Sequence, residues 1–221
     1  MCGRNHQEIL GYREVTGMKK AVKILKKKSF IKKEMDRQLG KELSDEIWQN
    51  AHEKLDGFLK RYEDLPEGVH LHTDNYIFPS SAIYLSAIEK TEKETAYRII
   101  EDSASALTNK AAKIMNGILA IPGMKSLFVR IWRPLCNKMY GENNGFENVY
   151  YPCEKDEFRM DIVSCPFCHY FMELGCPELT KVFCENDDRV YGNLKGIEFK
   201  RTSTLGKGAD RCDFYFRRKR N

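Results

Sequence analysis

The hydrophobic period of this chain changes near residues 141–145, and that change limits the fold more than any other feature. Before it, apolar residues recur every three or four positions, which places them on one face of a helix; the clearest set is Leu43, Ile47, Trp48, Ala51, Leu55, Phe58, Leu59 and Tyr62. After it, Phe158, Met160 and Ile162 alternate with charged residues, as in a strand with one buried face. The chain is therefore predicted to be α+β, with a helical part at 1–145 and a small part of antiparallel strands and two helices at 146–221, packed as one compact unit.

Local signals divide the helical part. Thr91 and Glu94 have the spacing of a capping box, which predicts a helix start there. Residues 105–119 are predicted to form a further helix that ends at Ile121-Pro122-Gly123, and 124–139 a short helix interrupted at Pro134.

The C-terminal part is predicted to run strand, two helices, strand, strand. Pro166 follows Ser164-Cys165 as in a helix start, Gly175 ends that helix, and Pro177 begins the second. Strands are expected at 197–204 and 211–217, joined by the loop 205–210 as a hairpin.

The net charge of +5 comes largely from lysines between Lys19 and Lys33 and from the basic run 217–220. Apolar residues are interleaved with those lysines, so an amphipathic helix with a solvated face explains them better than a nucleic-acid surface, and nucleic acid is disfavoured as a partner. No stretch is apolar enough for a signal peptide or a membrane span, so we expect a cytoplasmic protein with no membrane partner.

Eight cysteines in such a protein are expected to be reduced thiols, metal ligands or catalytic groups. Cys165 and Cys168 form a C-x-x-C pair, and Cys176 and Cys184 follow, so these four are the set that would hold zinc if zinc is present. The competing interpretation is that Cys168 and Cys176 are small buried apolar residues. Otherwise no cofactor is expected.

Cys184 and Asp187 are three positions apart, so on a helix they share a face. A thiolate at Cys184 requires a nearby cation such as Arg201 or His169, since the carboxylate opposes it. Cys212 and Asp213 are neighbours in a strand and should face opposite sides, with Cys212 on the face of Phe214 and Phe216. The loop glycines Gly206 and Gly208 would allow close backbone approach to a ligand, or simply form the hairpin turn.

Read together, F-C-E-N-D at 183–187 and R-T-S-T-L-G-K-G-A-D-R-C-D-F at 201–214 resemble the L-2-amino-thiazoline-4-carboxylic acid hydrolase family. The segment P-S-S-A-I-Y-L-S-A-I-E-K-T-E-K-E at 79–94 and S-C-P at 164–166 are also similar to that family. The residues carried over by position are Cys165, Cys184, Asp187, Arg201, Thr204, Gly208, Cys212 and Asp213.

The resemblance implies a hydrolase that opens a cyclic amidine or thiazoline ring, as in forming N-carbamoyl-L-cysteine, within the class acting on non-peptide carbon–nitrogen bonds. From the chemistry we expect Cys184 as nucleophile, Asp187 as acid/base or amidinium holder, and Arg201 as the seat of a carboxylate. Cys212 and Asp213 would complete the catalytic set, and Thr204, Gly208 and Cys165 would line the substrate site. The alternative is a non-catalytic module that binds zinc or a small ligand through its C-terminal cysteines. The expected partner is a small-molecule substrate, and a homo-oligomer is compatible with the sequence.

Overall fold

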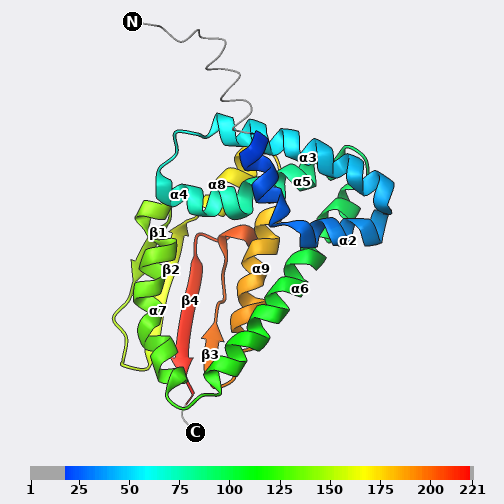
Figure 1. Ribbon diagram of the computed structural model, residues 1–221. Helices are drawn as coiled ribbons and strands as arrows, with labels where there is room; N and C mark the ends of the chain where they lie inside the picture. The colour runs from blue at the N-terminus through cyan, green and yellow to red at the C-terminus, as the bar shows by residue number, and fades with distance from the viewer. Residues whose placement is uncertain (1–17, 220–221) are drawn as a thin grey trace, which may run out of the picture. The chain divides into compact units, whose positions relative to one another are not determined.

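The computed structural model describes residues 18–219, so Arg220 of the basic run lies outside the described residues (Figure 1). Helices occupy most of the chain up to residue 140, and a four-stranded antiparallel sheet with further helices follows. The predicted α+β class is confirmed. Within the described residues no helix combines the length and the apolar character needed to cross a bilayer.

Contacts divide the chain into two compact units. The first comprises residues up to Leu65 together with Thr73–Ile100, and the second comprises Pro66–His72 with Glu101 onward. The sequence placed its boundary near 145, where the hydrophobic period changes. The units follow packing instead, because the helix at 124–140 packs on the sheet.

The first unit contains α2 (Ser29–Leu39), α3 (Lys41–Arg61), the short π-helix η1 (Thr73–Ile77) and α5 (Phe78–Ile88). α5 is buried on almost all sides and packs on α3, whose apolar face is the one predicted from sequence. Residues 18–26 are also helical, and there Leu25 is buried while the neighbouring lysines 26 and 27 are exposed. The interpretation of the lysine run as a solvated helix face is thus confirmed for the described residues.

Helix α6 (Lys93–Leu119) begins where predicted, but for a different reason. The Thr91 hydroxyl donates to the Ala87 carbonyl at 2.9 Å, so it caps the end of α5, and the predicted capping box is wrong in this respect. α6 also continues through residues 104 and 105, where two helices were expected. α7 (Met124–Tyr140) likewise runs through Pro134 without interruption.

In the second unit the strands β1 (Glu147–Tyr150), β2 (Glu157–Ser164), β3 (Ile197–Lys200) and β4 (Cys212–Arg218) form one sheet in the order β1-β2-β4-β3. The β3–β4 hairpin was predicted, although β3 ends at Lys200 rather than at 204, and β1 was not predicted. Register pairs Phe158 with Phe216 and Ile162 with Cys212. Apolar side chains therefore collect on one face and polar ones on the other.

The remaining elements of this unit are α4 (Glu67–His72), the 3-10 turn η2 (Glu142–Asn144), α8 (Pro166–Glu173), α9 (Leu179–Tyr191) and the 3-10 turn η3 (Leu205–Lys207). Both predicted helices after β2 are confirmed. Figure 1 shows α9 beside β3 and α7 beside β1 and β2. The order of elements thus brings α9 next to the loop that leads into β4.

The core of the second unit is an aromatic cluster between α7, α9 and the apolar face of the sheet. Phe216 at its centre has no exposed surface, and its ring lies within 6.2 Å of the rings of Phe128, Trp132, Phe158, Tyr191 and Phe199. Tilted and edge-to-face ring pairs of this kind add to the free energy gained by burying the rings.

Replacing Phe216 by Ala should therefore lower the free energy of unfolding by about 3–5 kcal/mol, since it leaves a cavity in close-packed aromatic surroundings. Urea unfolding followed by tryptophan fluorescence measures this. Met172→Ala on α8 is the control, because Met172 is 71% exposed and should change stability little. Equal effects of both substitutions would contradict the placement of the core at Phe216.

Candidate active site

Two cysteines meet where α9 packs beside the start of β4. Cys184 lies in the middle of α9 and Cys212 is the first residue of β4, and each thiol shifts the pKa of the other. Cys212 is 5% exposed, whereas Cys184 keeps partial exposure. Cys212 shares the apolar face with Phe214 and Phe216, as predicted. The pair therefore has one buried and one accessible sulfur.

Cys184 is the sulfur that carries the negative charge. The hydrogen bond from Cys212 lowers the pKa of Cys184 most, burial acts in the opposite sense, and the Thr204 hydroxyl, the charge of Arg201 and the Gly206 amide lower it further, to about 6. The same hydrogen bond, together with burial, raises the pKa of Cys212 above its ordinary range. Cys184 is thus a thiolate at neutral pH, and Cys212 a neutral donor to it.

The loop 204–208 shapes the surroundings of both sulfurs. The Thr204 hydroxyl and the Leu205 amide nitrogen each lie 3.2 Å from the sulfur of Cys212. A Cβ at Gly206 would stand 2.7 Å from the sulfur of Cys184, closer than side-chain carbons come in real structures, so only glycine fits. Gly208 is in the left-handed region with φ 85° and faces open space, so its glycine serves the turn.

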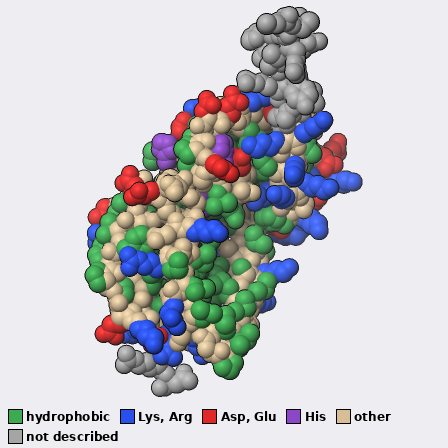
Figure 2. Space-filling model, turned by 60° about the vertical axis from the view of Figure 1, so that its left-hand side comes forward, with side chains coloured by type: hydrophobic (Ala, Val, Ile, Leu, Met, Phe, Trp, Pro, Cys, Tyr) green, Lys and Arg blue, Asp and Glu red, His purple; other side chains and the backbone are tan. Residues whose placement is uncertain are grey.

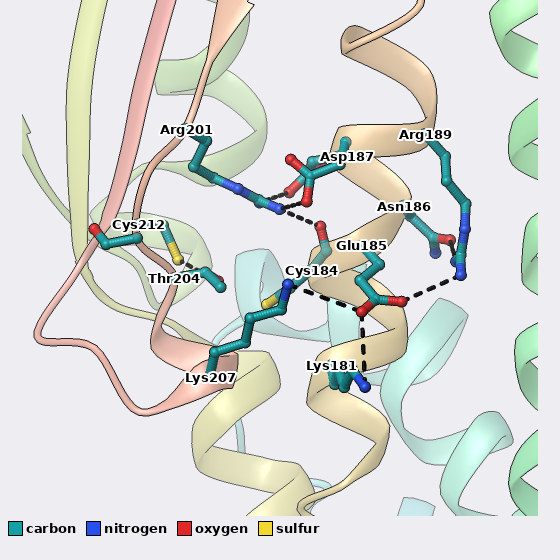
Figure 3. Close-up of polar contacts among 12 residues, drawn as sticks. Lys181, Cys184, Glu185, Asn186, Asp187, Arg189, Arg201, Thr204, Lys207 and Cys212 are labelled. Atoms are coloured by element: carbon teal, nitrogen blue, oxygen red, sulfur yellow. Dashed lines mark hydrogen bonds and ion pairs between the residues drawn. The ribbon is translucent and has the colours of Figure 1, made fainter.

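Arg201 is the cation that the thiolate requires. Its guanidinium donates to the Asp187 carboxyl at 2.9 Å, to the Cys184 carbonyl at 2.7 Å and to the Asp188 carboxylate at 2.5 Å (Figure 3). The arginine side chain is only 3% exposed, and its guanidinium lies over the Phe214 ring. All three of these hydrogen bonds therefore go to groups of α9. Three of its five N–H groups are thus used within the protein, and its expected role as the seat of a substrate carboxylate stays a prediction.

Asp187 is the second titratable group of the site. One third of its side-chain surface is accessible, yet burial of the carboxyl raises its pKa, Arg201 lowers it, and the nearby charges of Cys184 and Asp188 raise it, to about 7. The carboxyl is thus part-protonated near neutral pH, on the same helix face as the thiolate. The predicted sharing of a face is confirmed.

Asp213 holds the loop rather than lining the thiol pair. Its carboxylate accepts hydrogen bonds from the amide and hydroxyl of Thr202 and from the amide and hydroxyl of Ser203, at 2.6–3.0 Å. Burial would raise its pKa, but these donors outweigh it and the pKa is lowered. Asp213 therefore fixes the path of the chain between Arg201 and Thr204, and its expected catalytic role stays a prediction.

A second thiol pair lies at the start of α8. The free thiols of Cys165 and Cys168 interact, which together with burial raises the pKa of Cys165 well above its ordinary value; the interaction lowers the pKa of Cys168, while the charge of Cys184 opposes ionisation of Cys168. Cys176 is fully buried. Among residues 18–219 no three Cys, His, Asp or Glu side chains are grouped so that they could hold a metal ion, so the four-cysteine set is not assembled as a zinc site requires.

One residue of this site was not singled out from sequence. Lys207 extends from η3 toward α9, its ammonium 3.9 Å from Glu185, and its side chain is 53% exposed (Figure 3). It is an exposed cation on the loop that adjoins Cys184. Its place in the Gly-rich loop, between Gly206 and Gly208, was the available signal.

Most of the chain matches one protein family. The family model for L-2-amino-thiazoline-4-carboxylic acid hydrolase matches residues 70–216, more than half of the chain. The chain belongs to this family. The match covers all the carried-over residues, Cys165 to Asp213, and the family name indicates a hydrolase. Neither the curated proteins nor the solved structures gave a match to this family member.

If Cys212 lowers the pKa of Cys184 by donating a hydrogen bond, Cys212→Ala should raise that pKa by about one to two units, the equivalent of one hydrogen bond to a charged group. Cys212→Ser keeps a donor and should stay closer to the native value. The rate of alkylation at Cys184, followed by peptide mass spectrometry from pH 4 to 9, measures the shift. Identical profiles for the Ala variant and the native chain would exclude the proposed hydrogen bond.

Proposed function

We propose that this chain hydrolyses a small cyclic amidine of the 2-amino-thiazoline-carboxylate type, with Cys184 as nucleophile and Asp187 as acid. The observation that carries the proposal is the placement of Cys184 and Asp187 on one face of α9, where their surroundings lower the pKa of the thiol and raise that of the carboxyl. A nucleophile and an acid with pKa values set apart by their surroundings are what opening of such a ring needs.

In the first step the Cys184 thiolate attacks the ring carbon that is bonded to both nitrogens and to sulfur. The carbon–sulfur bond of the ring breaks, the substrate sulfur takes the proton of Asp187, and the amidine carbon remains bonded to the Cys184 sulfur. The product implied by the family keeps both nitrogens. The broken ring bond is therefore carbon–sulfur, not the carbon–nitrogen bond of the expected class.

In the second step water adds to the same carbon, and the Asp187 carboxylate accepts one of its protons. The tetrahedral intermediate then expels the Cys184 thiolate, the second proton of water passes to the imino nitrogen, and the oxygen of water becomes the carbonyl oxygen of an N-carbamoyl product. Donors that stabilise the thiolate before attack also stabilise it as a leaving group: Cys212, Thr204 and the Gly206 amide. Asp187 and Cys184 return to their starting states.

Arg201 serves the chemistry without touching the substrate, because it is buried and paired with the two carboxyls of α9. We assign the substrate carboxylate to Lys207 instead. Its contact with Glu185 is long at 3.9 Å and largely solvated, so exchanging that partner for a ligand costs little.

Incubation with L-2-amino-thiazoline-4-carboxylate should release free thiol and a ureido product, detected by a thiol reagent and by mass spectrometry. Cys184→Ser should abolish turnover, since a serine hydroxyl at this position stays protonated. Cys153→Ser, which changes an exposed thiol outside the cluster, is the control and should keep it. Substrate binding without ring opening by the native chain would favour the non-catalytic ligand-binding alternative.

The same assay tests Lys207. Lys207→Gln should raise KM for the carboxylated thiazoline and leave KM for 2-amino-thiazoline, which lacks the carboxylate, unchanged. An equal rise for both compounds would remove Lys207 from carboxylate binding.

The dependence of kcat/KM on pH should be bell-shaped with its maximum between about pH 6 and 7. Activity rises as Cys184 loses its proton, with a pKa of about 6, and falls as Asp187 loses its own, with a pKa of about 7. Asp187→Asn should lower kcat/KM by about 10²–10⁴-fold and remove the alkaline limb.

Asp188→Asn is the matched control, because it also takes a carboxylate from Arg201 but leaves the acid in place. It should keep the bell and move the alkaline limb to lower pH, since the charge of Asp188 helps to raise the pKa of Asp187. A flat profile in the native chain would contradict the assigned pair.

A further inference from the structure

We propose that the second unit has a separate binding pocket for a phosphate-bearing ligand, formed by α7, β1 and the β1–β2 connection. The pocket has a volume of about 310 Å³, within the range of small-molecule sites. It is lined by four basic side chains, namely Arg130, Arg133, Lys155 and Arg159, with Tyr150, Tyr151 and Cys153 among its other lining residues. Figure 2 brings this side of the second unit forward and shows Lys and Arg side chains between hydrophobic and uncharged ones.

The four basic side chains have no carboxylate partner among residues 18–219. Arg133 and Arg159 instead lie over the rings of Tyr150 and Tyr151, at 5.2 and 4.4 Å from the ring centroids. A stacked guanidinium keeps its in-plane N–H groups free for a ligand. Arg130 and Lys155 have no contact of either kind and are exposed.

One carboxylate, that of Glu157, lines the same pocket, and it accepts a hydrogen bond from the Tyr215 hydroxyl at 2.8 Å. Four cations against one anion leave a strong positive potential in a partly enclosed space. Elsewhere on this chain basic side chains such as Arg189, Arg217 and Arg218 are paired with carboxylates. Three arginines without a carboxylate partner among residues 18–219 gather in this pocket, which points to an anion supplied from outside.

The pocket is distinct from the thiol site. Its β2 residues, Glu157 to Arg159, pair with Tyr215 to Arg217 at one end of the β2–β4 ladder, whereas Cys212 pairs with Ile162 at the other end. A ligand in the pocket cannot therefore be the substrate bound at Cys184.

The arrangement favours a ligand with two linked phosphates over a single anion, because one monoanion would leave most of the positive charge uncompensated. Guanidinium groups suit phosphate oxygens through paired hydrogen bonds. Such a group can belong to a soluble diphosphate or to a phosphate-rich lipid head group, and the test below separates these sources.

Inorganic pyrophosphate is the first probe, measured by isothermal titration calorimetry on the full chain. It should bind more tightly than sulfate and should slow alkylation of Cys153, whose exposed thiol lies in the pocket, without slowing that of Cys168. Co-sedimentation with phosphatidylcholine vesicles containing diacylglycerol pyrophosphate, a lipid with two linked phosphates, is the second arm. Vesicle binding that pyrophosphate displaces assigns the pocket to lipid phosphate, and pyrophosphate binding without vesicle binding assigns it to a soluble ligand.

The double variant Arg130→Gln/Lys155→Gln should weaken binding about tenfold or more, and it disturbs no ring or ion contact of the fold. Lys110→Gln/Lys113→Gln removes two exposed charges of α6 outside the pocket and is the matched control. Failure of pyrophosphate and vesicles to bind, or equal weakening by both double variants, would overturn the proposal. Neither result bears on turnover at Cys184.

Discussion

The candidate site depends on the contact between Arg201 and α9. This buried cation joins the segment after β3 to that helix. Its guanidinium reaches two carboxyls and one backbone carbonyl of the same helix. A buried charge is tolerated only when it is paired and hydrogen-bonded, so this contact fixes where α9 lies against the loop. The position of Cys184 relative to Cys212, Thr204 and Gly206 follows from that.

The charges around Arg201 explain why the thiol and the carboxyl divide their roles. One cation faces Asp188, Asp187 and Cys184, so it cannot compensate three negative charges in a partly desolvated space. Asp188 is the more exposed of the two carboxyls. Hydrogen-bond donors around Cys184 lower the pKa of its thiol. The charge of Cys184 in turn raises the pKa of the Asp187 carboxyl. The pKa of Cys184 is thus lowered and that of Asp187 raised by the same set of charges.

Several elements were predictable because their signals are local. The three-residue spacing of Cys184 and Asp187 places them on one helix face, and strand alternation separates Cys212 from Asp213, whatever the rest of the fold does. The capping role of Thr91 was not predictable. Its hydroxyl can donate to a carbonyl at the end of the preceding helix or accept from an amide at the start of the next, and both groups are close in sequence. Pro134 was read as an interruption, yet packing of Phe128, Trp132 and Cys136 on the sheet keeps α7 continuous across it.

By itself, the sequence determined the α+β class, the helices carrying Cys168 and Cys184, the β3–β4 hairpin and the set of residues shared with the hydrolase family. Only the tertiary structure decided what these residues do. Arg201 could have faced solvent or substrate, and Asp213 could have faced the thiols. In the fold, Arg201 is hydrogen-bonded to Asp187 and Asp213 to Ser203, and these partners lie more than a turn away in sequence. The contacts of these side chains depend on which distant groups pack together and which become buried. The spacing of residues within one segment determines neither.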